Sequence, residues 1–361
     1  MTSNSDTAPR LHNLDYLRGI AAFGIMIYHY LTWAVGTFPA ETFLGRVGLY
    51  GVAIFYVLSG LTLFHVYFNS MNEGRTSVRN FFVKRTFRIF PLLWIITITA
   101  IVVYRKMPNL IDLFLNLTGL FGFVKWDAYL TTGAWSIGNE LVFYALFPLI
   151  VLAARNGKAL LLTFTAALFV PYAYFAFVGL SPNESLVVQW STYINPLNQA
   201  FLFIAGFAVG YFLRVRHVSQ RIAWGAAVAS ITVFILWPAM GDTITLITGV
   251  NRMVFTLSCI VLCVAAYKIT LSLPRILHAP LSTLGEASYS LYLIHPIVWG
   301  GVTFLLAPFL PPLARVVIAI LLSLVASYIC YRYFEKYFIS LGTRVVKRRS
   351  RNSPADAQGR L

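Results

Sequence analysis

Long apolar stretches recur along the chain, separated by short polar or charged segments. A membrane-spanning helix needs about 20 mostly apolar residues, because it must cross roughly 30 Å of hydrocarbon at 1.5 Å per residue. Ten stretches meet this requirement. Their approximate bounds are 14–34, 48–68, 86–104, 136–154, 159–178, 196–213, 221–238, 249–268, 284–306 and 312–334. The pattern therefore predicts an all-α integral membrane protein, a bundle of about ten transmembrane helices.

One apolar stretch, Leu110–Val124, is too short to span a bilayer comfortably. It belongs to the longest connection, at about 105–135. We expect it to lie at the membrane interface or to re-enter the membrane.

The composition and charge agree with a membrane protein. Of 361 residues, 58% are hydrophobic and 11% are charged, whereas soluble domains carry roughly 25% charged residues. The formal net charge is +16. Cytoplasmic connections of membrane proteins carry an excess of Lys and Arg, and most Lys and Arg here fall in alternate connections if the N-terminus is cytoplasmic. The charge thus indicates topology, with both termini cytoplasmic, rather than binding to nucleic acid.

The chain is expected to have three parts. Residues 1–13 form a cytoplasmic segment, residues 14–335 form the ten-span membrane domain, and residues 336–361 form a basic cytoplasmic tail. We expect this tail to be disordered and to lie on anionic lipid. The first span contains Arg18 and no small-residue cleavage site follows it, so we expect it to be retained rather than removed as a signal peptide. The predicted location is the cell membrane, plasma or inner, crossed several times.

The three cysteines give no sign of a metal site or of a disulfide framework. Cys259, Cys263 and Cys330 all lie in apolar runs. Cys259 and Cys263 share a helix face, but no His or Asp beside them completes a metal-binding set. We interpret all three as packing residues and expect no bound metal.

Polar side chains inside predicted spans are informative, because an ionisable group at mid-bilayer costs about 2.5–3.5 kcal/mol on insertion scales. Arg18 and His29 both lie in the first span. At 100° and 1.5 Å per residue, they share one helix face and lie about 16 Å apart along the axis. Asp15 is one turn from Arg18 and is expected to pair with it. Simpler roles stay open, namely a topology charge for Arg18 and a structural hydrogen bond for His29.

The second and third spans contain a small-residue pair and a basic cluster. Ser59 and Gly60, near the middle of the second span, favour close helix packing. Arg85 and Arg88 are one helical turn apart at the inner end of the third span. Two guanidinium groups with this spacing suit a polyphosphate such as coenzyme A. Positive charge at the cytoplasmic surface explains them equally well.

Later spans contain a carboxylate and a second histidine. Glu140 is about one turn inside the outer end of the fourth span, so we expect it at a depth similar to that of His29. A carboxylate beside an imidazole can hold its tautomer and raise its basicity, whereas the alternative is a structural role for Glu140. Trp135 is expected to anchor the outer interface. His295 precedes Pro296 in the ninth span, and we expect its role to be structural.

Five segments, in order along the chain, resemble the acyltransferase family 3 of membrane O-acyltransferases. They are LDYLRGIAAFGIMIYHY, GVAIFYVLSG, FVKRTFRIFPLLW, WSIGNELVFYALFP and SYSLYLIHPIV. The resemblance covers about residues 11–340. One departure is Gly138–Asn139 before Glu140, where many members have other residues. Each motif alone is weak, whereas five in order on a ten-span frame are specific.

The resemblance implies a function and a set of residues for it. Family members transfer an acyl group, commonly acetyl from cytoplasmic acetyl-coenzyme A, to hydroxyls of extracytoplasmic or lipid-linked carbohydrate such as exopolysaccharide or lipopolysaccharide. His29 would then act as general base, with Glu140 orienting it or binding the sugar, and Arg18, Arg85 and Arg88 would hold the coenzyme A phosphates. The supporting residues expected around them are Asp15, Ser59, Trp135, Ser136, Tyr289 and His295. Acyl-coenzyme A is a co-substrate, and no permanently bound cofactor is expected.

Two other classes of function stay open. A transporter or flippase for a glycan or small anion also places charged residues inside its bundle, but we see no relation between two halves of this chain, which many transporters show. A membrane scaffold or sensor would tolerate the loss of His29. Within the enzyme class, a donor such as succinyl-coenzyme A and a covalent acyl-histidine intermediate also stay open, and the sequence does not indicate the oligomeric state.

Overall fold

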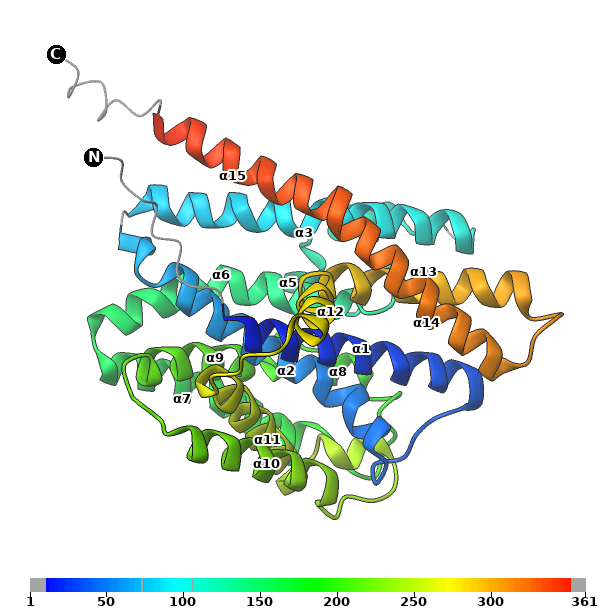
Figure 1. Ribbon diagram of the computed structural model, residues 1–361, viewed down its shortest axis with the longest axis horizontal. Coiled ribbons are helices and arrows are strands. Elements are labelled where there is room, and N and C mark those ends of the chain that lie inside the picture. The colour runs from blue at the N-terminus through cyan, green and yellow to red at the C-terminus, as the bar shows by residue number, and fades with distance from the viewer. Residues whose placement is uncertain (1–10, 73, 106, 352–361) are drawn as a thin grey trace.

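The computed structural model describes residues 11–72, 74–105 and 107–351, and within these ranges the chain forms helices and no strand (Figure 1). The α-helices are α1 (His12–Val35), α2 (Phe43–Tyr67), α3 (Arg75–Tyr104), α4 (Leu110–Thr118), α5 (Phe121–Val124), α6 (Ala134–Asn156), α7 (Lys158–Tyr174), α8 (Trp190–Tyr193), α9 (Ala200–Leu213), α10 (Gln220–Leu236), α11 (Gly249–Lys268), α12 (Arg275–Glu286), α13 (Ser288–Leu306), α14 (Pro312–Ile329) and α15 (Lys336–Arg351). Two π-helical segments, Phe175–Gly179 and Cys330–Glu335, continue α7 and α14. The predicted all-α class is confirmed.

Seven helical segments in the described ranges are long and apolar enough to cross a membrane. They are Phe43–Tyr67, Arg75–Val103, Ala134–Asn156, Lys158–Gly179, Gly249–Lys268, Ser288–Leu306 and Pro312–Arg348. The apolar helices α9 and α10 have only 14 and 17 residues. α1 has 24 residues, but polar side chains such as Arg18 and His29 lower its hydropathy. Each predicted run thus contains a helix, while the count of ten spans and the cytoplasmic position of both termini stay predictions.

The structure divides the ninth predicted run, 284–306. Its first residues belong to α12, which ends at Glu286, and α13 begins at Ser288. α12 packs against α1, and a Cβ on Gly285 would come within 2.2 Å of the Asp15 carbonyl oxygen. Because apolar residues continue across the break, hydropathy alone does not separate the two helices.

The predicted disorder of the tail 336–361 is wrong for its first part. Lys336–Arg351 forms α15, which packs along α3 (Figure 1). The two helices approach closely, since a Cβ on Gly342 would lie 2.8 Å from the Phe87 Cβ. Apolar and basic residues alternate at helical spacing in this segment, so that one face can pack on protein while the other carries charge. Most of the predicted N-terminal segment, 1–13, and the remaining tail residues lie outside the described part of the chain.

The longest connection folds over the start of α6. Leu110–Val124 forms the short helices α4 and α5, and the buried amide of Asn116 bonds three backbone groups of this connection. α5 packs on α6 with backbone contact between Gly122 and Gly138. Residues 134–139 are consequently all buried, so α6 begins inside the folded protein rather than at its outer surface.

α1 and α2 lie at the centre of the bundle. α2 packs on α1, α9 and α11, while α1 also packs on α12, α13 and α14. The backbones of α2 and α9 touch, because a Cβ on Gly60 would lie 1.9 Å from the Phe203 carbonyl oxygen and one on Gly206 would lie 1.9 Å from that of Val57. Close packing at Ser59–Gly60 is therefore confirmed for Gly60.

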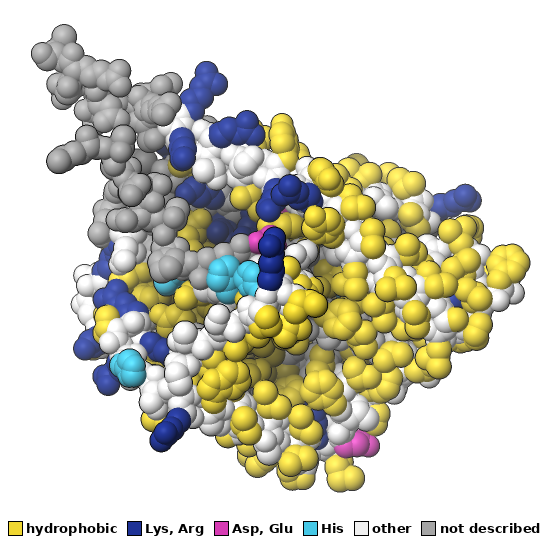
Figure 2. All heavy atoms as spheres, in the orientation of Figure 1, with side chains coloured by type: hydrophobic (Ala, Val, Ile, Leu, Met, Phe, Trp, Pro, Cys, Tyr) yellow, Lys and Arg dark blue, Asp and Glu magenta, His cyan; other side chains and the backbone are white. Residues whose placement is uncertain are grey.

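The surface has an apolar part and a basic part. Figure 2 shows hydrophobic side chains covering much of the right-hand side of this face, while Lys and Arg gather toward the left end and the upper edge. Many large apolar side chains are exposed, including Phe304, Phe309 and Leu321. Lipid solvates such side chains directly, so this surface is what a multi-pass membrane protein requires.

Candidate functional site

A polar cavity of about 310 Å³ lies inside the bundle. α1, α2, α3, α6 and α13 contribute its lining. Its polar lining residues are Arg18, Tyr56, Ser59, Thr62, Arg85, Arg88, Ser136, Glu140, Tyr144, Ser288, Tyr289 and Tyr292. Each of the five helices carries one of the segments singled out in the sequence, so the fold brings all five segments together.

Arg18 projects from α1 into this cavity. Its guanidinium donates to Asp15 Oδ1 at 3.2 Å and to Thr62 Oγ1 of α2 at 3.0 Å. The predicted ion pair between Arg18 and Asp15 is therefore present. Two hydrogen bonds orient the guanidinium, and within the described part of the chain they use two of its five N–H donors.

Two further arginines of α3 line the same cavity. Arg85 donates to the Tyr67 hydroxyl at 3.1 Å, and its guanidinium carbon lies 5.3 Å from the Tyr67 ring and 5.6 Å from the Tyr144 ring. Its Nε is buried without a hydrogen-bond partner. Arg88 lines the cavity one turn further along α3. Three arginines and a single carboxylate, Glu140, thus face one enclosed space, an arrangement that attracts a multiply charged anion.

Glu140 is held by hydroxyl groups rather than by a histidine. Its Oε1 accepts a hydrogen bond from Ser59 Oγ at 2.9 Å and another from the Tyr144 hydroxyl. Ser59 is one helical turn from Thr62, the partner of Arg18, so Glu140 lies near the level of Arg18.

This placement corrects the expectation that Glu140 and His29 share a depth. Ser136 is four residues before Glu140, and its Oγ lies 2.9 Å from the Tyr292 hydroxyl, one turn before His295. Four residues on α6, from Glu140 to Ser136, and three on α13, from Tyr292 to His295, together separate Glu140 from the histidines by about 10 Å along the bundle, at 1.5 Å per residue. The carboxylate lies deeper than expected because α6 begins inside the protein.

His29 is instead paired with His295. His29 Nδ1 lies 2.9 Å from His295 Nε2, and the two rings are parallel, with centroids 5.1 Å apart. His295 is 1% exposed, and its Nδ1 lies 3.1 Å from the Leu291 carbonyl oxygen. The Trp33 ring stacks on the His29 ring at 5.0 Å.

These contacts fix the tautomers of both neutral rings. A carbonyl oxygen only accepts, so His295 Nδ1 carries the proton and His295 Nε2 is the acceptor. His29 Nδ1 must then donate to it. The proton position follows from the hydrogen-bond partners and leaves His29 Nε2 unprotonated, with its lone pair available.

The histidine pair lies just beyond the end of the polar cavity that Ser136 and Tyr292 line. His29 and His295 do not line it, but Tyr292 and Ser136 do. The Tyr292 ring centroid is 6.1 Å from that of His295. Polar groups therefore follow one another through the bundle, from the arginines past Glu140 and Ser136 to the two imidazoles.

Two supporting residues differ in their placement. Tyr289 lines the cavity, and its hydroxyl donates to the Ile89 carbonyl at 2.7 Å, which ties α13 to the helix of Arg88. Trp135 is 7% exposed and meets the Trp190 ring edge to face at 5.6 Å. The expectation that Trp135 anchors a membrane interface is wrong, because Trp190 and Tyr193 of α8 pack against its ring.

Sequence reasoning missed several polar residues of the cavity. Tyr144, Thr62 and Tyr292 were not singled out, although each lies one turn from a residue that was: Glu140, Ser59 and His295 respectively. A search for hydroxyl-bearing residues at helical spacing from these three would have found them. In the described ranges, no group of three His, Cys, Asp or Glu could hold a metal ion.

Comparisons with known proteins assign this chain to a family. A family model described as an acyltransferase domain matches residues 11–332, so the chain belongs to the acyltransferase family 3. It is 23% identical over 364 residues to the peptidoglycan O-acetyltransferase OatA of Listeria monocytogenes, a match that covers 90% of this chain and 55% of that protein. It is 27% identical over 190 residues to Nodulation protein 10 of Rhizobium leguminosarum, covering 43% of this chain and 48% of that protein. The chain thus spans about half the length of these curated relatives. No solved structure matches it.

Proposed function

We propose that this protein is a membrane O-acyltransferase of the cell membrane. It moves an acyl group, acetyl in our proposal, from cytoplasmic acyl-coenzyme A to a hydroxyl of an extracytoplasmic or lipid-linked carbohydrate, such as exopolysaccharide, lipopolysaccharide or a similar glycan. The main support for the proposal is the continuous series of polar side chains inside the bundle. Three arginines lie at one end of this series, and an imidazole with a free lone pair lies at the other. Membership of an acyltransferase family supports it.

The arginines form the donor end of this site. Guanidinium groups bind phosphate through paired, charge-assisted hydrogen bonds, and Arg18, Arg85 and Arg88 share one cavity. Anchoring the coenzyme A phosphates there leaves the thin acyl-bearing arm to extend past Ser136 toward His29. The distance of about 16 Å between Arg18 and His29 along α1 is one that only an extended arm can bridge.

His29 is the general base in this proposal. Its Nε2 takes the proton of the sugar hydroxyl while the hydroxyl oxygen attacks the thioester carbonyl carbon. The carbon–sulfur bond then breaks, and the coenzyme A sulfur receives the proton from His29 Nε2. An ester and a free thiol are formed, and the imidazole is restored to its starting state.

His295 and Glu140 act as positioning residues. The hydrogen bond at 2.9 Å to His295 holds His29 in the tautomer that leaves Nε2 free. Glu140 accepts from Tyr144, whose ring faces the Arg85 guanidinium. Glu140 therefore holds the donor end in place and balances part of its positive charge, in place of the contact with His29 that the sequence led us to expect.

Membranes containing wild type or His29→Ala at matched protein levels test this proposal. Labelled acetyl-coenzyme A is added, and label is followed into glycan and glycolipid fractions; labelled succinyl-coenzyme A serves as the alternative donor. We expect acetyl label in the wild-type glycan fraction and none with His29→Ala. Full incorporation by the variant would remove His29 as base. No incorporation from either donor, together with no donor binding, would favour a transporter or flippase.

A further inference from the structure

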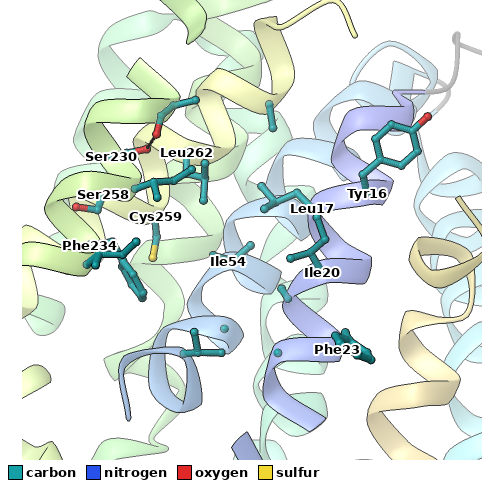
Figure 3. Close-up of a pocket in the computed structure, with 18 of the residues that line it drawn as sticks. Tyr16, Leu17, Ile20, Phe23, Ile54, Ser230, Phe234, Ser258, Cys259 and Leu262 are labelled. Carbon is teal, nitrogen blue, oxygen red and sulfur yellow. Dashed lines mark hydrogen bonds between the residues drawn. The ribbon is translucent and has the colours of Figure 1, made fainter. Parts of the chain in front are cut away.

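A second cavity lies on the other face of α1 and α2. It has a volume of about 750 Å³ and is bounded by α1, α2, α10 and α11 (Figure 3). Its α1 lining includes Ile20, Gly24 and Ile27, which lie about 180–240° around the helix from Arg18 at 100° per residue. α1 and α2 therefore separate this apolar cavity from the polar cavity, and it is not part of the site described above.

The apolar cavity offers almost no hydrogen-bonding atoms. Ser230 and Ser258 line it, but each donates to a carbonyl of its own helix, at 2.9 and 3.0 Å. The hydroxyl of Tyr16 is bonded to His278 Nδ1. A buried water needs two to four polar partners, and a cavity without them stays free of water. Since the surrounding helices lie in a bilayer, hydrocarbon is the solvent that fills this space.

The size of the cavity indicates how much hydrocarbon it holds. An apolar cavity of about 150 Å³ binds one benzene molecule, which has six carbons. A cavity of about 750 Å³ therefore accommodates on the order of 30 carbon atoms. That amount corresponds to the two acyl chains of one membrane lipid rather than to a small apolar molecule.

A polar residue lines the inner end of the cavity, and two basic residues are close in sequence to residues of its lining. Asn13 lines this end, where its Nδ2 donates to the Ile269 carbonyl and its buried Oδ1 has no partner. Arg221 is exposed one turn before Trp224, which also lines the cavity. Lys268 directly precedes Ile269, and its ammonium uses two of its three N–H donors on the carbonyl oxygens of Leu213 and Arg216. A phosphate beside these basic residues would meet complementary charge, and a headgroup donor would satisfy Asn13 Oδ1.

We propose that the apolar cavity is a binding site for one anionic bilayer glycerophospholipid. Its chains lie between α1–α2 and α10–α11, and its phosphate lies at the inner end beside Arg221 and Lys268. The lipid completes the packing between these helix pairs and supports the back of α1 opposite Arg18. The proposal does not rest on acyl transfer, and it is tested by lipid content rather than by activity.

A matched pair of substitutions on α10 tests occupancy of the cavity. Ala227 lines it and is buried, whereas Ala229 on the same helix is exposed and does not line it. Protein extracted from cell membranes in mild detergent is examined by native mass spectrometry and lipid phosphorus analysis. We expect wild type and Ala229→Phe to retain one phospholipid and Ala227→Phe to lose it. Equal retention by both variants, or retention of a phosphate-free isoprenoid instead, would overturn the proposal.

A photo-crosslinking experiment on unaltered protein covers the case in which Ala227→Phe does not fold. Wild type is placed in phosphatidylglycerol vesicles containing a phospholipid with a photoreactive group at its chain end. We expect crosslinks at cavity residues such as Phe234 and Leu262, which Figure 3 shows facing the space. Crosslinks confined to residues outside the cavity would contradict the proposal.

The preference for an anionic headgroup is tested by a separate experiment. Arg221→Gln should reduce retention of phosphatidylglycerol relative to phosphatidylcholine, while Arg79→Gln, an exposed arginine of α3, should leave the ratio unchanged. An unchanged ratio in Arg221→Gln would remove the anionic headgroup from the proposal.

Discussion

The two cavities lie back to back against the same two helices and differ in almost every other respect. The polar cavity has about 310 Å³ and is lined by three arginines and a glutamate, whereas the apolar cavity has about 750 Å³ and two serines whose hydroxyls are already bonded to their own helices. α1 presents Arg18 to the first and Ile20 to the second. Opposite faces of one membrane helix can therefore differ in polarity. The polar face of α1 lowers the mean hydropathy of the whole helix, although its other face is apolar.

The largest expected effect is at the histidine pair beyond the polar cavity. His29→Ala removes the proposed base and should lower acetyl transfer by about 10²- to 10⁴-fold. Initial rates with labelled acetyl-coenzyme A, at matched protein levels, measure it. His217→Ala, at an exposed histidine in the connection before α10, is the control and should leave the rate unchanged. A rate within twofold of wild type for His29→Ala would contradict the assignment.

A charge placed on each side of α2 tests the comparison directly. Ile54 lines the apolar cavity and Thr62 lines the polar one. Ile54→Asp should lower the free energy of unfolding by about 2.5–3.5 kcal/mol, because the carboxylate has no partner there. Thr62→Asp should cost clearly less, since Arg18 donates to that position at 3.0 Å. Thermal unfolding in detergent compares the two, and equal losses would mean that the cavities do not differ in this way.

Substitution of an arginine at the donor end should weaken the affinity for acetyl-coenzyme A. Arg88→Ala removes a charged hydrogen-bond donor worth about 1.5–3 kcal/mol, so the KM for acetyl-coenzyme A should rise by roughly 10- to 100-fold with a smaller change in kcat. Arg79→Ala, nine residues earlier on α3 and exposed, is the matched control. An unchanged KM in Arg88→Ala would leave positive charge at the cytoplasmic surface as the role of this arginine.

His295 should have a smaller effect that depends on hydrogen bonding. His295→Phe keeps a ring but removes the acceptor of His29 Nδ1, and the loss of one hydrogen bond of about 0.5–1.5 kcal/mol corresponds to transfer that is about 2- to 13-fold slower. His295→Gln supplies an amide oxygen as acceptor and should recover part of the rate. Steady-state kinetics of both variants distinguish a hydrogen-bonding role of His295 from a purely structural one, because a purely structural role predicts no rescue by Gln.

The smallest effect is expected outside both cavities, at α4. The Lys125 ammonium lies 2.9 Å from Asp112 Oδ1 and holds the pKa of that half-buried carboxyl below its ordinary value. A carboxyl whose pKa is lower in the folded state contributes stability at neutral pH that is lost as pH falls through the folded pKa, below about 3.9. Asp112→Asn should therefore lower the melting temperature slightly at pH 7, and the difference from wild type should shrink as the pH falls below about 3.9. A larger decrease in melting temperature at acidic pH than at pH 7 would contradict a lowered pKa of Asp112 in the folded state.

Much of the fold follows from the chain alone, because apolar length is a local property. Each of the ten apolar runs contains a helix. The errors occur where tertiary contacts decide the outcome. The break at Ala287 depends on contact of α12 with α1, and the helix Lys336–Arg351 is stabilised by packing on α3.

The candidate site shows the same division. Residues on one helix could be related by spacing, so the Arg18–Asp15 pair was predicted correctly. Relations between helices depend on where each helix begins, which spacing does not give. Glu140 was expected beside His29 because α6 was taken to start at the outer surface. The pairing of His29 with His295, 266 residues away, was missed because spacing along one helix does not give it.

In the proposed function, the fixed rise of α1 sets the length that an acyl donor must have. Arg18 and His29 are held at opposite ends of about 16 Å of rigid helix, so a thioester can be anchored and activated at once only if its arm matches that span. Small activated acyl compounds lack this reach, and longer carriers without phosphates lack the anchor. In the proposed function, helix geometry therefore selects the acyl carrier, whichever acyl group the carrier bears.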